Sequence, residues 1–375
     1  MEAARQTEHG IDTGFRPRAH FSVLSKDPVL NSRAKSRMFL AYLNRVVSRA
    51  ALSPDEAYQS MLAILSGEVS PPQIAAFLVA LRMKGETAEE LGGFARAMRE
   101  KSVRVDPGLG AEPLIDTCGT GGDGGRTFNV STIAAFVVAG AGVRVAKHGN
   151  RSLSGLCGSA DLLEELGIRL LSSADDVSRA IREVGIGFLF APAFHPAMKH
   201  AQPVRAELKI RTVFNLLGPM ANPAGANFQL IGAPSIGAAE LMANALAGLG
   251  VQRVFVVHGA DGLDEITTTG PTSVFEVCGS RVQTFTWTPA DFGVKEAAAQ
   301  DIAGGDRSAN REIAEAVLGG SSGPRRDIVL VNAAAALVVA DRAADLEDAM
   351  RLAADSIDSG AAQSKLAALA DFSRR

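Results

Sequence analysis

The chain has 375 residues and a formal net charge of −3, with 47% hydrophobic and 21% charged residues. Its length allows two domains, and its composition is ordinary for a globular protein. The small negative charge argues against nucleic-acid and membrane surfaces, and no apolar run is long enough to span a bilayer. The run 328–340 contains Asn332 and predicts a buried helix. The three cysteines lack metal-ligand spacing and fit reduced thiols, so a cytoplasmic protein is expected.

The N-terminal part predicts an extension followed by a helical domain. Residues 1–37 mix both charges without periodicity and lack the apolar core of a signal peptide, so we expect a poorly ordered extension. The helical domain is expected over residues 38–106, beginning at Met38. Three capping boxes mark its helices, because each has Ser or Thr followed three positions later by Glu or Gln. They are Ser53–Glu56, Ser70–Gln73 and Thr87–Glu90.

After a linker at 107–113, short β-rich segments alternate with helical segments. This rhythm predicts an α/β fold over residues 113–375, with a central, mostly parallel sheet flanked by helices. The segment 195–219 is helical and polar and interrupts the rhythm, so we expect part of it to complete the helical domain. The stretch 328–372 is expected to be helical. Strands are expected at 143–146, 187–190, 228–231, 253–257 and 273–277.

The glycine cluster at 119–125 follows an apolar run and precedes a helix expected near Ser131. Glycine N–H groups and a helix N-terminus together favour a phosphate ligand. A dinucleotide loop fits poorly, because no acidic residue lies between Asp123 and Asp161 to bind a ribose. A Walker A loop is excluded, since no Gly-Lys-Ser/Thr follows. The alternative without a ligand is a flexible connector, and a phosphate or pyrophosphate site is the better interpretation.

Several ordered motifs carry a family resemblance. From about Met38 to its C-terminus, the chain resembles the anthranilate phosphoribosyltransferases. This resemblance implies transfer of the phosphoribosyl group of 5-phosphoribosyl 1-pyrophosphate to the amine of anthranilate, releasing pyrophosphate, in tryptophan biosynthesis. The motifs are Gly119-Thr-Gly-Gly-Asp123, Thr127-Phe-Asn-Val-Ser-Thr132, Lys147-His-Gly-Asn-Arg151, Gly158-Ser-Ala-Asp161, His195-Pro-Ala-Met-Lys199, Phe214-Asn-Leu-Leu-Gly-Pro219 and Asp261-Gly-Leu-Asp-Glu-Ile266.

For the donor site, the resemblance implies catalysis by positioning and electrostatics with no covalent nucleophile. Glycine N–H groups and the positive end of a helix suit pyrophosphate, and Lys147 adds a cation. A lone lysine is more often solvated, and hydroxyls at a helix start are often simple caps. The implied donor-binding residues are Gly119, Thr120, Gly122, Asp123, Thr127, Asn129, Ser131, Thr132 and Lys147.

Asp264 and Glu265 are the candidate metal ligands. They follow the apolar run 254–257, near the expected carboxyl end of a parallel strand. Mg²⁺ is often held by one or two carboxylates together with substrate phosphates and water, so Mg²⁺ is the expected cofactor. By resemblance, Ser131 completes one metal site. Adjacent acids on a loop are otherwise usually just solvated.

For the acceptor, the resemblance assigns Arg205 to the carboxylate of anthranilate, to which a guanidinium can donate two hydrogen bonds. It also implies a homodimer through the helical domain. The other residues implied to line the acceptor site are Gly119, His148, Asn150, His195 and Gly218. Two stretches depart from the family pattern, 154–157 and 124–126, and neither removes a proposed ligand.

Two alternatives with the same fold remain open at this stage. A pyrimidine nucleoside phosphorylase would use a comparable glycine loop for phosphate, but it lacks the pair Asp264-Glu265. A nonenzymatic nucleic-acid-binding relative is disfavoured by the net charge of −3. Dependence on Mg²⁺ distinguishes the first alternative, and salt-sensitive DNA binding without turnover would support the second.

Overall fold

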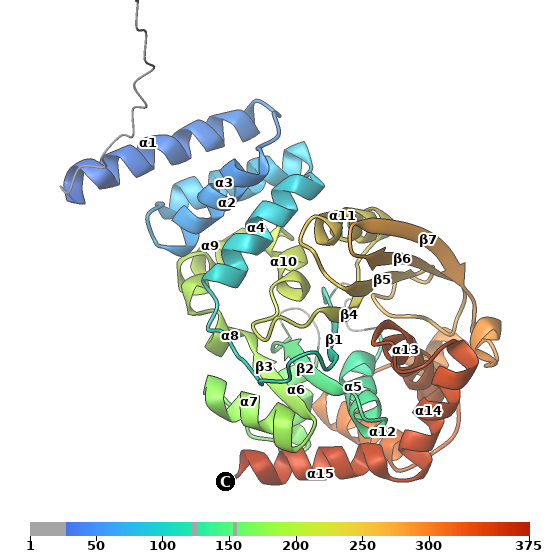
Figure 1. Cartoon of the computed structure of the whole chain (residues 1–375). Helices are drawn as coiled ribbons and strands as arrows, with labels where there is room; N and C mark the ends of the chain where they lie inside the picture. Colours follow the sequence, from blue (N-terminus) through green and yellow to red (C-terminus); the bar gives the residue numbers. More distant parts are fainter. Residues whose placement is uncertain (1–27, 122–125, 153–155) are drawn as a thin grey trace, which may run out of the picture.

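The computed structural model describes residues 28–121, 126–152 and 156–375, and it begins with a bundle of helices (Figure 1). The helix α1 begins at Pro28, before the predicted start of the folded part at Met38. Among the described residues, no helix is long and apolar enough to cross a membrane. The bundle consists of α1 (Pro28–Val47), α2 (Pro54–Leu65), α3 (Pro71–Lys84) and α4 (Ala88–Glu100).

All three predicted capping boxes begin helices of this bundle. The Ser53 N–H donates to Glu56 Oε2 at 2.8 Å, and the Thr87 N–H donates to Glu90 Oε2 at 2.9 Å. Glu90 is fully buried, and it also accepts from Lys84 Nζ at 2.8 Å. Capping residues thus fix where α2 and α4 begin, and these two helices pack against each other.

The second layer is a seven-stranded sheet with the order β3-β2-β1-β4-β5-β6-β7. The first five strands in this order are parallel, as predicted, and β6 and β7 are added antiparallel at one edge. The strand β7 was not predicted. The strands are β1 (Leu114–Gly119), β2 (Arg144–Gly149), β3 (Ile186–Phe190), β4 (Phe228–Gly232), β5 (Arg253–Gly259), β6 (Thr272–Cys278) and β7 (Arg281–Trp287).

Alternating side chains of the central strands enter two different cores. Ile115, Leu230 and Phe255 pack into the core built with α5, α13, α14 and α15. Ile231 and Val256 point to the opposite face and pack into the core shared with α11 and the N-terminal bundle. These flanking helices are α5 (Val130–Gly140), α11 (Ile236–Ala247), α13 (Pro324–Val339), α14 (Leu346–Asp358) and α15 (Ala361–Ser373).

The segment that interrupts the α/β rhythm packs against the bundle. Its residues Val204, Phe214 and Leu217 share one core with Phe77 and Phe94 of the bundle. It comprises η1 (Pro196–His200), α9 (Gln202–Leu208) and α10 (Phe214–Met220). The remaining elements are α6 (Ser159–Glu165), α7 (Ala174–Glu183), α8 (Ala191–Phe194), η2 (Pro289–Phe292), η3 (Ala299–Ile302) and α12 (Arg307–Leu318).

Candidate active site

The candidate site lies where four neighbouring parallel strands end. The strands β1, β2, β4 and β5 finish at Gly119, Gly149, Gly232 and Gly259, and Gly119 is opposite Gly232 in the register. In open α/β sheets, ligands bind beyond the carboxyl ends of the strands. The predicted donor motifs follow β1, and Lys147 and His148 lie in the last half of β2.

Close contacts with Asp264 explain two of the glycines at this edge, Gly119 and Gly232. A Cβ atom on Gly119 would stand 2.6 Å from Asp264 Oδ2, and one on Gly232 would stand 1.6 Å from the Asp264 carbonyl oxygen. The Gly121 N–H donates to Asp264 Oδ2 at 2.9 Å, and Gly121 has a φ of 66°. Gly119 and Gly121 therefore let the chain after β1 lie directly against a candidate metal ligand. The predicted donor residues Gly122 and Asp123 lie outside the described residues.

The N-terminus of α5 is linked to the second candidate metal ligand. The helix begins at Val130, and the Ser131 N–H donates to Glu265 Oε1 at 3.2 Å. An acidic group here also interacts favourably with the positive end of the helix. Asn129 precedes α5, and its backbone N–H and side-chain amide donate to Asn310 Oδ1 at 3.0 and 3.1 Å.

The hydroxyl groups of three predicted donor residues have different surroundings. The Oγ1 atoms of Thr120 and Thr132 are buried and have no hydrogen-bond partner within the described part of the chain. Thr127 Oγ1 donates to the Ile302 carbonyl at 2.7 Å, so this hydroxyl ties the loop to a neighbouring segment. Buried hydroxyls are normally hydrogen-bonded, so the O–H groups of Thr120 and Thr132 are available as donors to a phosphate ligand.

Lys147 is buried between β1 and the start of α5 rather than solvated. Its Nζ atom donates to the Thr117 carbonyl at 2.5 Å and lies 3.5 Å from Ser131 Oγ. Burial lowers the pKa of Lys147, while Asp116 opposes this shift. Burial likewise raises the pKa of Asp116, which lies in the same network. Lys147 therefore lies behind Ser131, and its amino group, when protonated, contributes to the field at the start of α5.

The two acids suit a cation that is completed by substrate. Asp264 is only 7% exposed, and Glu265 is partly buried. Both follow β5 and reach the glycine loop or α5 through the bonds described above. Within the described ranges, no cluster of three or more His, Cys, Asp or Glu side chains could hold a metal. Such a donor set fits Mg²⁺, which commonly takes its remaining ligands from phosphates and water.

The loop that carries these acids is fixed from two sides. Asp261 Oδ2 accepts hydrogen bonds from the hydroxyls of Thr267 and Thr269 at 2.5 and 2.6 Å. Asn332 of α13 accepts from the Ile266 N–H at 3.0 Å and donates to the Ile266 carbonyl at 2.8 Å. Asn332 is fully buried, and these bonds satisfy its amide group. A polar residue within the apolar part of α13 thus holds the loop at its far end.

The acceptor side is built around two buried histidines. The rings of His148 and His195 lie 5.1 Å apart, centroid to centroid. His148 Nδ1 is 3.1 Å from the Gly218 carbonyl, so the neutral ring carries its proton on Nδ1 and leaves Nε2 as an acceptor. Burial lowers the pKa of His148 to about 3 and the pKa of His195 to about 4. Both Nε2 atoms are buried without a partner among the described residues.

The Arg205 side chain is partly buried and has no acidic partner among the described residues. Its guanidinium lies over the Phe214 ring, 5.2 Å from the centroid, and Nη1 donates to Gln202 Oε1 at 3.3 Å. No carboxylate of the described part of the chain forms an ion pair with it. Burial lowers the pKa of Arg205. A partly desolvated guanidinium without an acid partner is suited to an anionic ligand.

Asn150 differs from the other predicted acceptor residues. It is exposed, and its Oδ1 atom accepts from the Arg151 N–H at 2.8 Å. Its backbone N–H donates to Ser159 Oγ at 3.2 Å. The structure therefore brings His148, His195 and Gly218 together, whereas the side chain of Asn150 takes part in the local turn.

Comparison with known proteins identifies both domains. The family model for the helical bundle domain of the glycosyl transferase family matches residues 40–102. The model for the a/b domain of that family matches residues 111–363. Anthranilate phosphoribosyltransferase from Solibacter usitatus is 62% identical over 89% of this chain and 98% of that protein. The chain belongs to the anthranilate phosphoribosyltransferase family.

Solved structures of this family agree with the fold. The crystal structure of the Thermus thermophilus enzyme has a TM-score of 0.83 and 42% identity, covering 89% of this chain and 99% of that one. The Saccharomyces cerevisiae enzyme in complex with PRPP and Mg has a TM-score of 0.82 and 31% identity, covering 90% and 98%. The fold class, the family and the function predicted from the sequence are thereby confirmed, and the phosphorylase alternative loses its support.

Several residues near the site were not predicted from the sequence. Arg211 bonds to the glycine loop, and Asn310 holds the start of α5. Asn222 Nδ2 donates to Asp116 Oδ2 at 2.8 Å, and Asp116 Oδ1 accepts from the His148 N–H at 3.1 Å. Their local sequences carry no common signal, since Asn310 stands among polar residues, and a local pattern does not reveal a partner far away in the sequence.

The departures from the family pattern fall at the rim of the site. Leu156 is 69% exposed, and the carbonyl oxygen of the partly buried Cys157 accepts from Asn129 Nδ2 at 3.2 Å. Arg126 Nη1 donates to the Asp261 carbonyl at 3.0 Å, so the additional cation contacts the loop of the acid pair. The other residues of both stretches, 124–125 and 154–155, lie outside the described residues.

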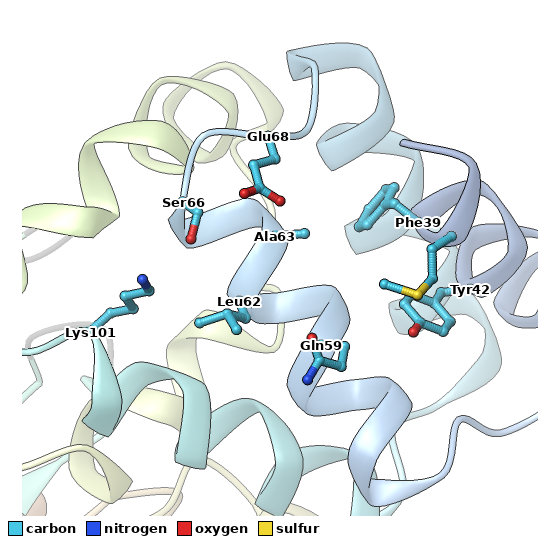
Figure 2. Close-up of a pocket in the computed structure, with 9 residues that line it drawn as sticks. Phe39, Tyr42, Gln59, Leu62, Ala63, Ser66, Glu68 and Lys101 are labelled. Atoms are coloured by element: carbon cyan, nitrogen blue, oxygen red, sulfur yellow. The ribbon is translucent and has the colours of Figure 1, made fainter. Parts of the chain in front are cut away.

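A cavity of about 270 Å³ lies apart from these residues, in the N-terminal bundle (Figure 2). Phe39 and Tyr42 of α1 face Gln59, Leu62 and Ala63 of α2 across it. None of the predicted site residues lines this cavity. The described cavity is therefore a feature of the bundle and not of the candidate active site.

Proposed function

We propose that this chain transfers the phosphoribosyl group of 5-phosphoribosyl 1-pyrophosphate to the amine of anthranilate, giving N-(5-phosphoribosyl)anthranilate and pyrophosphate. The observation that carries the proposal is the meeting of the glycine loop, the start of α5 and the acid pair. Gly121 bonds to Asp264, and Ser131 bonds to Glu265, across more than a hundred residues of sequence. Family membership adds the reaction class.

The donor half suits the charge that develops on the leaving group. The amine nitrogen attacks C1 of the ribose while the C1–O bond to pyrophosphate breaks, and pyrophosphate leaves with the electron pair. The nitrogen then loses a proton. The N-terminus of α5, the hydroxyls of Thr120 and Thr132, and the cation of Lys147 favour an anion at this place. Positioning and electrostatics therefore supply the rate enhancement.

Mg²⁺ is the proposed cofactor, held by Asp264 and Glu265 together with pyrophosphate oxygens, with Ser131 beside them. When bound, it supplies charge neutralisation of the leaving pyrophosphate. The fit rests on the two carboxylates, which are hard oxygen donors near the start of α5. The PRPP and Mg complex of the Saccharomyces cerevisiae enzyme supports this assignment.

Anthranilate is proposed to bind between the two histidines and Arg205. The guanidinium of Arg205 donates to the carboxylate, and the neutral rings of His148 and His195 line the aromatic slot. The unprotonated Nε2 atom of His148 can accept a hydrogen bond from the amine, and the buried Nε2 atom of His195 has no other partner among the described residues. The Saccharomyces cerevisiae enzyme in complex with 4-fluoroanthranilate supports an acceptor of this class.

The test mixes the full chain with anthranilate, 5-phosphoribosyl 1-pyrophosphate and Mg²⁺ and follows the loss of anthranilate fluorescence. We expect turnover that stops on removal of Mg²⁺ with a chelator and returns on its addition. Benzoate, which lacks the amine, serves as the control acceptor and yields no product. Absence of fluorescence loss with folded protein would overturn the proposal.

A homodimer through the helical domain is also proposed, in the cytoplasm. Exposed apolar side chains on α1 and α3 support the dimer; they are Met38, Leu40, Val47 and Met83. The three cysteines are free thiols, which suits a reducing compartment. Sedimentation equilibrium measures the mass, and Met83→Glu is expected to weaken the dimer. A monomeric wild-type chain at micromolar concentration would contradict it.

A further inference from the structure

Arg211 lies on the acceptor side of the site but bonds to the donor side. It belongs to the short stretch between α9 and α10, after Lys209, which ends α9 with a φ of 51°. Its Nη1 atom donates to the Gly121 carbonyl at 3.1 Å, and Nη2 lies 3.4 Å from the Thr120 carbonyl. Side chain and loop are thus joined across about ninety residues of sequence.

The peptide unit between Thr120 and Gly121 is held at both ends. Its carbonyl faces the guanidinium of Arg211, and its N–H donates to Asp264 Oδ2 at 2.9 Å. Because a peptide unit is planar, fixing the carbonyl also fixes the direction of the N–H. The charged groups at both ends polarise the chain of hydrogen bonds in the same sense, which strengthens it.

The guanidinium has no competing acid. No carboxylate of the described ranges forms an ion pair with Arg211, and the side chain is half-buried. Its hydrogen bonds are therefore directed to the two loop carbonyls. Guanidinium is suited to this contact because its planar fork presents several donors in fixed directions.

We propose that Arg211 is a positioning residue for the donor site, which aligns the Thr120–Gly121 peptide and through it the carboxylate of Asp264. It acts through the loop and not by contact with the reacting atoms. This proposal rests on the proposed function, since it concerns the donor of that reaction. It assigns to one segment, 205–211, an acceptor residue at its start and a donor-site residue at its end.

The test compares Arg211→Gln and Arg211→Lys with the control Arg281→Gln. Arg281 is an exposed arginine on β7 whose side chain forms no hydrogen bond or ion pair within the described residues. Initial rates give the KM values for both substrates. Calorimetry measures binding of 5-phosphoribosyl 1-pyrophosphate with Mg²⁺, and thermal unfolding checks that each variant is folded.

Loss of the charged bonds in Arg211→Gln is expected to raise the donor KM and dissociation constant about tenfold. The anthranilate KM should stay within about twofold, because the contacts of Arg205 are retained. Arg211→Lys should lie between wild type and Arg211→Gln, since lysine keeps the charge but not the fork. Arg281→Gln should match wild type.

Equal increases in both KM values, or no change in donor binding, would overturn the role of Arg211. Should Arg211→Gln fail to fold, Arg211→Lys tests the same difference between the donor KM and the anthranilate KM. Failure of the proposed function is distinguishable, because wild-type protein would then show no transfer at all. In that case, calorimetric donor binding by wild type and Arg211→Lys still decides whether Arg211 positions the loop.

Discussion

The donor and acceptor halves of the site satisfy their charged groups in different ways. In the donor half, Asp264 and Glu265 accept hydrogen bonds from backbone N–H groups, and Lys147 donates a hydrogen bond to a backbone carbonyl. In the acceptor half, the guanidinium of Arg205 has no acid partner in the described structure, and both histidines are neutral. The donor half is therefore organised by the protein itself, whereas the acceptor half is organised to a greater extent by its ligand.

This difference follows from where the residues originate. The donor groups lie at the ends of adjacent strands of one sheet, whose spacing and register are fixed by backbone hydrogen bonds. Arg205 lies on α9, a helix of only seven residues that packs against the bundle. Changes in the donor half should consequently affect metal-dependent chemistry, and changes in the acceptor half should affect affinity for one substrate.

The largest effect is expected for Asp264→Asn. Loss of the carboxylate charge removes a candidate Mg²⁺ ligand and weakens the bond from the Gly121 N–H. We expect kcat/KM to fall about 100-fold, as when a group that stabilises developing charge is removed. Steady-state rates over a range of Mg²⁺ concentrations measure this loss.

Asp355→Asn is the matched control for this change. Asp355 is exposed and pairs with Arg351 on the surface, a contact that contributes little. Its kcat/KM should equal that of wild type. Wild-type activity in Asp264→Asn at any Mg²⁺ concentration would remove this residue from the donor half.

A smaller and more selective effect is expected for Arg205→Ala. Without the guanidinium, the acceptor carboxylate loses a charge-assisted pair of hydrogen bonds, and the anthranilate KM should rise about 10- to 100-fold. The donor KM should change less than about twofold. The two arginines on this segment, Arg205 and Arg211, should thus give opposite patterns in one two-substrate rate matrix. A parallel rise in both KM values for Arg205→Ala would show that the halves are not separable.

Two glycines offer a third way to test the comparison. A Cβ atom at Gly119 would stand 2.6 Å from Asp264 Oδ2, whereas a Cβ atom at Gly218 would lie within 4 Å of no atom beyond its chain neighbours and its own helix backbone. Gly119→Ala should therefore displace the carboxylate and raise the donor KM by about tenfold. Gly218→Ala adds a Cβ atom that approaches no group of the donor half, so it should leave the donor KM within about twofold of wild type. Steady-state rates measure the donor KM of both variants, and urea unfolding measures their stability. An equal donor KM in the two variants would contradict the packing described.

The sequence revealed the local features of the fold and the residue types of the site. Capping boxes such as Ser53–Glu56 act over three residues, so their pattern predicts the helix start directly. The acids Asp264 and Glu265 were proposed as metal ligands because they follow an apolar strand, and the structure joins them to the Gly121 and Ser131 N–H groups. The strand β7 was missed, although its alternation and the two-residue turn after Cys278 indicate a hairpin.

Long-range partners could not be predicted in this way. Asn332 and Ile266 are 66 residues apart, and Arg211 and Gly121 are 90 apart. Such pairs form only because the sheet order places β1 beside β4 and the helical segment returns to the loop. Whether a polar side chain is a solvated residue or a fixed partner is decided by tertiary packing, which periodicity does not record.

The smallest expected effect concerns the two neutral histidines. Burial lowers the pKa of His148 to about 3 and of His195 to about 4 in the folded state, against an ordinary value of 6.5. Between these values the unfolded chain binds more protons than the folded one, so stability increases with pH and levels off above about 6.5. Each histidine should lower the free energy of unfolding by about 1 kcal/mol at about pH 5.5 relative to pH 7.5.

Urea unfolding of wild type and His195→Gln at both pH values measures this contribution. The variant has one fewer titrating imidazole, so its stability should fall by about 1 kcal/mol less than that of wild type on acidification. His148→Asn should also reduce the loss of stability on acidification, because it removes the other imidazole. Its amide can still donate a hydrogen bond to the Gly218 carbonyl. The anthranilate KM of wild type should remain nearly constant across this range, because both rings stay neutral. An unchanged pH slope in both variants would show that these rings are protonated as readily in the folded chain as in water, and the acceptor half would then lack its neutral lining.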